Sequence, residues 1–88
     1  MNNATKTVTY WLQHVENDVL RAEVQAAAAR LLADRRRNPL ESIAFKQCFP
    51  NQRTGITSMA EMLIKCAMIE VDWIAAARAI SSGVMVSI

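Results

Sequence analysis

The chain has 88 residues, of which 52% are hydrophobic and 20% charged, and its formal net charge is +2. That length fits one domain spanning residues 1–88, which can bury roughly 60–65% of the surface of its unfolded chain. With only two cysteines, Cys48 and Cys66, the composition excludes a disulfide scaffold, and without CxxC or Cys/His spacing it gives no support to a structural zinc site.

The first predicted element is a helix over residues 7–36. Its apolar residues recur at helical spacing, and the stripe shifts by one position halfway along. The residues concerned are Val8, Leu12, Val15, Val19, Leu20, Val24, Ala27 and Leu31. The four alanines at 26–29 leave a bare surface that a second helix can approach closely. Residues 5–11 are also good strand formers, so strand and helix both stay open for that segment.

A second, shorter helix is predicted over residues 38–49. Asn38 is a capping residue, Pro39 suits the first helical position, and Glu41 completes a capping box. Pro50 is expected to end this helix.

A third helix is predicted over residues 58–81, beginning with a capping box formed by Ser58 and Glu61. Along it, apolar residues alternate four and three apart, as in a coiled-coil seam, and a second apolar face predicts burial on two sides. Gly83 is placed to end this helix, and the apolar tail at 84–88 is expected to pack against the core or a second subunit.

Catalysis has little support in the sequence. The chain has a single histidine, His14, and lacks phosphate-loop, nucleophile-elbow and zinc-protease motifs. Neither Cys48 nor Cys66 has a basic neighbour at a spacing that favours a reactive thiolate, so both are expected to be buried thiols. We therefore expect no enzyme activity, no cofactor and no metal.

A membrane location is also disfavoured. Residues 59–80 nearly have the length of a transmembrane helix, but five charged side chains interrupt them. These are Glu61, Lys65, Glu70, Asp72 and Arg78. The first ten residues do not have the pattern of a secretory leader, so the expected location is the cytoplasm.

The preferred hypothesis follows from the excess of apolar residues over buried positions. We expect an all-α domain of three helices that forms a homodimer through its third helix and C-terminal tail. The predicted dimer or partner interface comprises Met62, Cys66, Ile69, Trp73, Ala76, Ile80, Val84 and Val86. The expected function is that of a small regulator or inhibitor that binds a protein partner, of the kind encoded by phages, plasmids and bacteria.

The alternative is a regulator that binds nucleic acid. A basic corner between the first two predicted helices would then contact phosphates. Its residues are Arg35, Arg36, Arg37, Lys46 and Arg53. The small net charge and the flanking acids Asp34 and Glu41 count against this alternative, and stabilisation of a helix C-terminus is a sufficient structural reason for the arginines.

Overall fold

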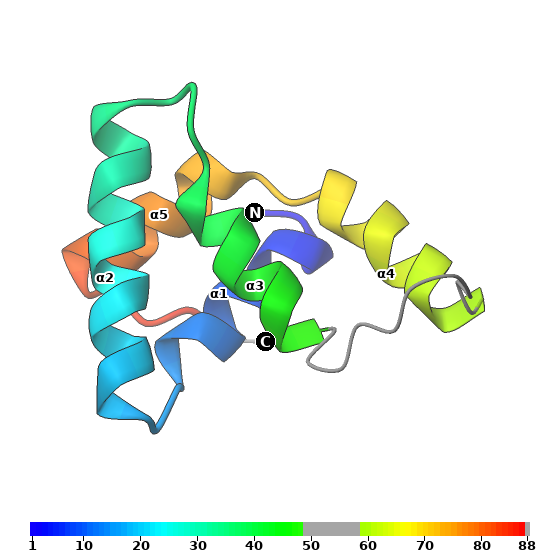
Figure 1. The fold of residues 1–88 in the computed structure, drawn as a ribbon, viewed down its shortest axis with the longest axis horizontal. Coiled ribbons are helices and arrows are strands. Elements are labelled where there is room, and N and C mark those ends of the chain that lie inside the picture. Colours follow the sequence, from blue (N-terminus) through cyan, green and yellow to red (C-terminus); the bar gives the residue numbers. More distant parts are fainter. Residues whose placement is uncertain (49–58, 88) are drawn as a thin grey trace.

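The structure is a computed structural model that describes residues 1–48 and 59–87. Within those residues the chain is entirely helical and has no strand, which confirms the all-α class (Figure 1). The helices are α1 (Asn3–Gln13), α2 (Asp18–Ala33), α3 (Pro39–Cys48), α4 (Met59–Ile69) and α5 (Trp73–Ser82). The expected stop at Pro50 and the capping role of Ser58 lie outside the described residues.

Four of these helices begin with an asparagine or aspartate cap. In each, the side-chain Oδ1 accepts a hydrogen bond from the backbone N–H three residues further on, at 2.8 to 3.1 Å. The caps are Asn2, Asn17, Asn38 and Asp72, for α1, α2, α3 and α5 respectively. Such a side chain satisfies an N–H that has no partner within the helix, so it favours the start of a helix over its interior.

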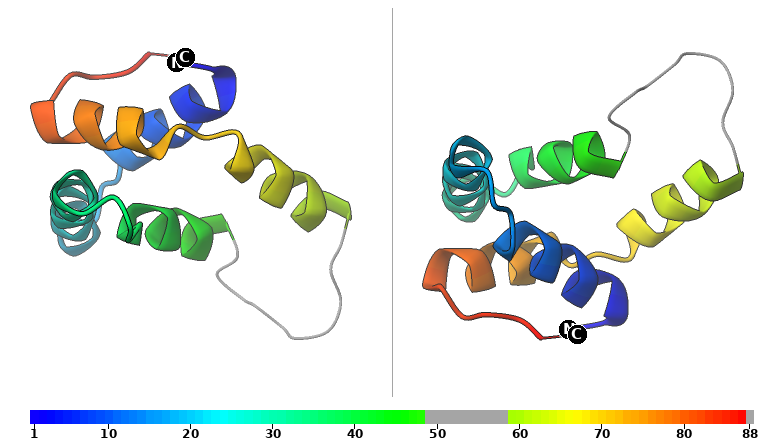
Figure 2. Two further views of the ribbon diagram at one scale, coloured as in Figure 1. Left: turned by 90° about the horizontal axis from the view of Figure 1, so that it is seen from above. Right: turned by 90° about the horizontal axis from the view of Figure 1, so that it is seen from below.

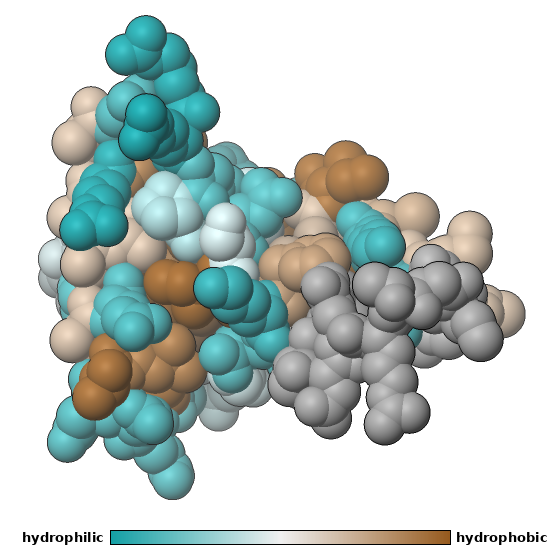
Figure 3. All heavy atoms as spheres, in the orientation of Figure 1, coloured by the Kyte–Doolittle hydropathy of each residue, from teal (hydrophilic) through white to brown (hydrophobic). Residues whose placement is uncertain are grey.

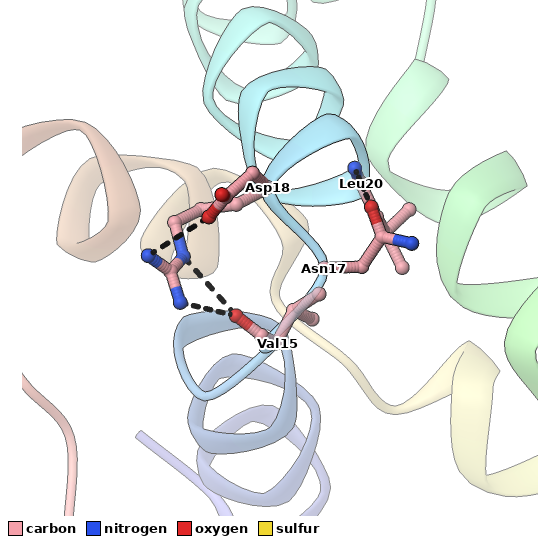
Figure 4. A network of polar contacts seen from close by, with 5 residues as sticks. Val15, Asn17, Asp18 and Leu20 are labelled. Carbon is pink, nitrogen blue, oxygen red and sulfur yellow. Dashed lines mark hydrogen bonds and ion pairs between the residues drawn. The ribbon is translucent and has the colours of Figure 1, made fainter.

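The prediction of one helix over residues 7–36 is wrong, because Asn17 starts a new helix. Segment 5–11 is helical and belongs to α1, which ends at Gln13, while α2 ends at Ala33. The turn between them is closed by Arg21, whose Nε and Nη2 donate to the Val15 carbonyl oxygen at 3.1 and 2.8 Å (Figure 4). Arg21 Nη1 also lies 3.7 Å from Asp18 Oδ1.

The prediction of one helix over residues 58–81 is also wrong. The break lies between Ile69 and Trp73, where Asp72 caps α5 and Val71 is buried. Capping by Asp72 competes with continuation of the helix, because the aspartate oxygen takes the place of a backbone acceptor. As a result, α4 and α5 point in different directions (Figure 2).

The core lies between α1, α2 and α5, and α3 covers one side of it (Figure 2). Its largest members include Leu12 of α1, Leu31 of α2, Leu40 of α3 and Ile80 of α5. α2 and α5 share the most extensive helix contact, and both contribute buried alanines to the core. The expectation that a helix packs against the alanine run of residues 26–29 is thereby confirmed.

Helix α4 lies outside this core. It packs closely against none of the other helices and extends away from them in both views of Figure 2. None of the helices in the described parts of the chain has the length and apolar character needed to cross a bilayer.

Candidate functional site

Helix α4 has an exposed apolar side, which the exposed Lys65 flanks. We call it the α4 apolar face, and it consists of Met59, Met62, Leu63, Cys66, Ala67 and Ile69, all exposed. The four largest of these side chains, Met59, Met62, Leu63 and Ile69, are 77%, 58%, 60% and 82% exposed. Figure 3 shows brown and tan surface where α4 extends from the body. Large apolar side chains so close together on one helix are unusual on a surface that only water covers.

Helix α4 is apolar on both sides, whereas an ordinary surface helix is polar on the side that faces water. Its inward side carries Met68, which is 7% exposed, and the half-buried Ile64 and Glu61. At 3.6 residues per turn these three positions lie opposite the α4 apolar face. A helix covered only by water would turn its apolar side inward. The outward side of α4 therefore exposes large apolar side chains that a surface helix usually buries.

One hydrogen bond connects the segment just beyond the C-terminal end of α4 to the start of α1. Asn2 Nδ2 donates to the Glu70 carbonyl oxygen at 2.7 Å, which ties the end of α4 to the start of α1. Beside this end lies a hollow of about 410 Å³ between α3, α4 and α5. It is lined by Glu41, Phe45, Lys65, Met68, Ile69 and Trp73. Ile69 therefore belongs both to the α4 apolar face and to the edge of this hollow.

The structure brings together only part of the predicted interface. Met62, Cys66 and Ile69 lie on the α4 apolar face, but Trp73 is half-buried against the core. Ala76 and Ile80 are 0% and 2% exposed within the chain's own core, so they are not accessible to a second chain. The break before α5 separates the two groups.

The buried or exposed state of several residues was predicted wrongly. Cys66 is exposed, not a buried thiol, and Met59 and Leu63 are exposed although burial on two sides was expected. The reason is that burial of α4 on both sides depended on a continuous helix packed along the core. The side chain of Cys48 is outside what the structure describes.

The C-terminal tail lies along α1. Gln13 Nε2 donates to the Val84 carbonyl oxygen at 2.6 Å, and the Val86 N–H donates to Gln13 Oε1 at 2.8 Å. Val86 is half-buried, whereas the side chains of Val84 and Met85 remain 63% and 58% exposed. The tail is thus attached to its own chain through its backbone and still presents apolar side chains to solvent.

The basic corner is exposed and lies beyond the end of α2. Arg35, Arg36 and Arg37 follow Ala33, so only Arg30 lies in the last turn of α2 and complements its dipole. The expectation that the arginine run forms the helix end is therefore wrong. Arg36 Nε pairs with Asp34 Oδ1 at 3.3 Å.

Arg30 was not part of the predicted corner. It lines a hollow of about 670 Å³ together with Ala33, Asp34, Arg37, Asn38, Pro39 and Ser42, so the Asp34 carboxylate shares this hollow with the two arginines. Lys46 is exposed in the last turn of α3, at the other end of that helix from the corner, so the structure does not bring it to this site. Arg53 lies outside the described residues.

His14 is exposed at the end of α1. Its ring stacks on Tyr10 with centroids 4.0 Å apart, and its Nδ1 lies 2.7 Å from the Tyr10 carbonyl oxygen. Among the residues that the structure describes, no group of three or more His, Cys, Asp or Glu side chains is placed to hold a metal ion.

No protein-family model matches the chain, and no curated protein or solved structure is significantly similar to it. The functional argument therefore depends on the surface of the molecule itself.

Proposed function

We propose that the protein is a non-enzymatic regulator or inhibitor that is located in the cytoplasm. It acts as a homodimer by binding another protein. The observation that carries this proposal is the α4 apolar face. Its methionines are flexible and polarisable, which suits a surface that adapts to a partner. The exposed Val84 and Met85 of the tail add a second apolar area to the same proposal.

The energetics favour contact over solvent exposure for these side chains. Full burial of one Leu, Ile or Met side chain contributes about 1.5–3 kcal/mol relative to exposure in water. The α4 apolar face contains four such side chains that are more than half exposed. Covering them by a protein surface would repay part of the entropy lost on association.

Affinity capture with matched variants tests the proposal. The baits are the wild type, Ile69→Lys on the α4 apolar face, and Val19→Lys as the control. Val19 is also β-branched and 70% exposed, but it lies on α2, away from α4. We expect the wild type and Val19→Lys to capture the same partner protein from host-cell lysate after nuclease treatment. We expect Ile69→Lys to lose this partner protein. Retention of nucleic acid alone, or equal capture by all three baits, contradicts the proposal.

Nucleic-acid binding at the corner is the second candidate function, and the hollow lined by Arg30 and Arg37 favours it. Arginine binds phosphate through paired N–H donors. If this candidate is right, affinity for duplex DNA or RNA falls steeply between 50 and 200 mM salt, and joint alanine substitution of Arg30 and Arg37 flattens the dependence. The same double substitution leaves the dependence unchanged if the corner does not bind phosphate.

A further inference from the structure

We propose that residues 70–72, which connect α4 to α5, form a hinge with two hydrogen-bonded arrangements. One is the bent arrangement of this structure. In the other, α4 and α5 join into a single straight helix. Asn2 and Thr5, at the start of α1, hold the bent arrangement through hydrogen bonds to the hinge. The hinge is a property of one chain and does not depend on what binds the α4 apolar face.

The residues at the break are able to form a helix. Residues 59–82 contain no glycine and no proline, the two residue types that oppose a helix interior most strongly. Asp72 has a φ of −83° and a ψ of 92°, so its φ is close to that of a helix and its ψ is not. Rotation of this ψ is part of the change from bent to straight. The bend is therefore maintained by interactions and not by a residue that is unable to be helical.

Three backbone groups at the break have partners that replace those of a continuous helix. In such a helix each N–H donates to the carbonyl oxygen four residues earlier. The Asp72 N–H donates instead to Thr5 Oγ1 at 2.8 Å, and the Ala75 N–H donates to Asp72 Oδ1 at 3.1 Å. The Glu70 carbonyl oxygen accepts instead from Asn2 Nδ2 at 2.7 Å. All three groups have a partner in either arrangement, so the two arrangements differ little in backbone hydrogen bonding.

The packing of the helices allows α4 to move while α5 stays in place. Helix α5 has extensive contacts with α1 and α2 in the core, whereas α4 packs closely against no helix and extends away from the others (Figure 2). Met68 and Val71, on either side of the end of α4, are each 7% exposed. Their burial favours the bent arrangement together with the contacts of Asn2 and Thr5. We therefore expect the bent arrangement to predominate while these contacts are intact.

The two residues that hold the hinge also start α1. Asn2 Oδ1 accepts from the Thr5 N–H and from Thr5 Oγ1, at 2.8 and 2.7 Å, while Nδ2 of the same side chain holds the Glu70 carbonyl oxygen. Fraying of the first turn of α1 thus releases the hinge and changes the direction of α4 relative to the core. Because coupling between sites is reciprocal, a molecule that binds one arrangement of α4 more tightly also changes the order of the first turn of α1.

Three substitutions in the full chain each remove one of the replacement partners. Asn2→Asp removes the donor to the hinge but keeps the oxygen that caps α1, Thr5→Val removes the acceptor of the Asp72 N–H, and Asp72→Ala removes the cap of α5. The triple variant is compared with the wild type, with Asp72→Ala alone and with Asp72→Asn, which keeps a capping oxygen. NMR measures the Cα chemical shifts of Val71 and residue 72 relative to the random-coil values. It also detects an NOE between the Ile69 Hα and the amide proton of residue 72, which is typical of a helix.

Loss of one hydrogen bond changes the ratio of straight to bent chains by roughly 2- to 10-fold, and loss of three changes it by roughly 10- to 1,000-fold. We expect helical shifts and the NOE in the triple variant, a smaller shift of the same sign in Asp72→Ala, and wild-type values in Asp72→Asn. Wild-type or random-coil shifts at Val71 and residue 72, in a triple variant whose α2 remains helical, would overturn the hinge. If the triple variant does not fold, equal Val71 shifts in Asp72→Ala and Asp72→Asn overturn it.

Discussion

Thr5 and Asp72 are 67 residues apart in the sequence and are joined by a hydrogen bond, in which the Asp72 N–H donates to Thr5 Oγ1 at 2.8 Å. Thr5 is fully buried, and its hydroxyl donates in turn to Asn2 Oδ1 at 2.7 Å. Asn2 is also the residue that holds the Glu70 carbonyl oxygen. Two side chains at the start of α1 therefore fix the segment between α4 and α5, and with it the direction in which α4 extends.

Replacement of Thr5 by valine tests this connection. Thr5→Val keeps the shape of the side chain but leaves the Asp72 N–H without its acceptor, which we expect to lower the free energy of unfolding by about 1–3 kcal/mol. Urea denaturation measures the change. Thr7→Val is the control, because Thr7 is exposed and its hydroxyl bonds only within α1, to the Asn3 carbonyl oxygen. Equal stability of the two variants would show that the Thr5 hydroxyl does not hold the segment.

Gln13 is expected to hold the C-terminal tail. Gln13→Leu removes both side-chain hydrogen bonds to the backbone of Val84 and Val86 while keeping a side chain of similar size. We expect amide hydrogen exchange at Val86, followed by NMR, to accelerate roughly 2- to 10-fold, the equivalent of one hydrogen bond. Gln47→Leu on the exposed side of α3 serves as the control and leaves that rate unchanged. An unchanged rate in Gln13→Leu would mean that the tail is held by other contacts.

Gly83 ends α5 in the left-handed region, with φ at +75°. A Cβ at this position would meet no atom within 4 Å, so only the backbone conformation opposes a side chain. We expect Gly83→Ala to lower the free energy of unfolding by about 1 kcal/mol, measured by thermal or urea denaturation. Ser81→Ala, two residues earlier at an exposed site, is expected to change the free energy of unfolding by less than about 0.5 kcal/mol. A neutral Gly83→Ala would contradict the left-handed cap.

The helical class and much of the core were predictable from the sequence, because the spacing of hydrophobic residues shows which of them lie together on one side of a helix. Leu12, Val24 and Leu31 lie in the core as their spacing indicates. The helix boundaries were less predictable. Asn38 was recognised as a cap because Pro39 follows it, whereas Asn17 and Asp72 interrupt patterns that continue at helical spacing on both sides. A polar side chain able to accept from the N–H three residues on was the signal available at those two positions.

The interface was predictable only in part, for the same reason. The seam over residues 62–80 treats Met62 and Ile80 as equivalent, although the break at 70–72 leaves the first exposed and buries the second. Periodicity identifies an apolar side of a helix but not what covers that side. Arg30 was missed because it lies seven residues before Arg37 in sequence, and the turn between α2 and α3 brings both to one hollow.

Sedimentation equilibrium of the wild type, Ile69→Lys and Val19→Lys over a micromolar to millimolar range of concentration tests the central claim most directly. We predict about twice the 9.8 kDa chain mass for the wild type and for Val19→Lys, and the mass of a single, folded chain for Ile69→Lys. A wild type that sediments as a 9.8 kDa monomer throughout this range, or an Ile69→Lys protein that remains a dimer, would contradict a dimer formed through the α4 apolar face.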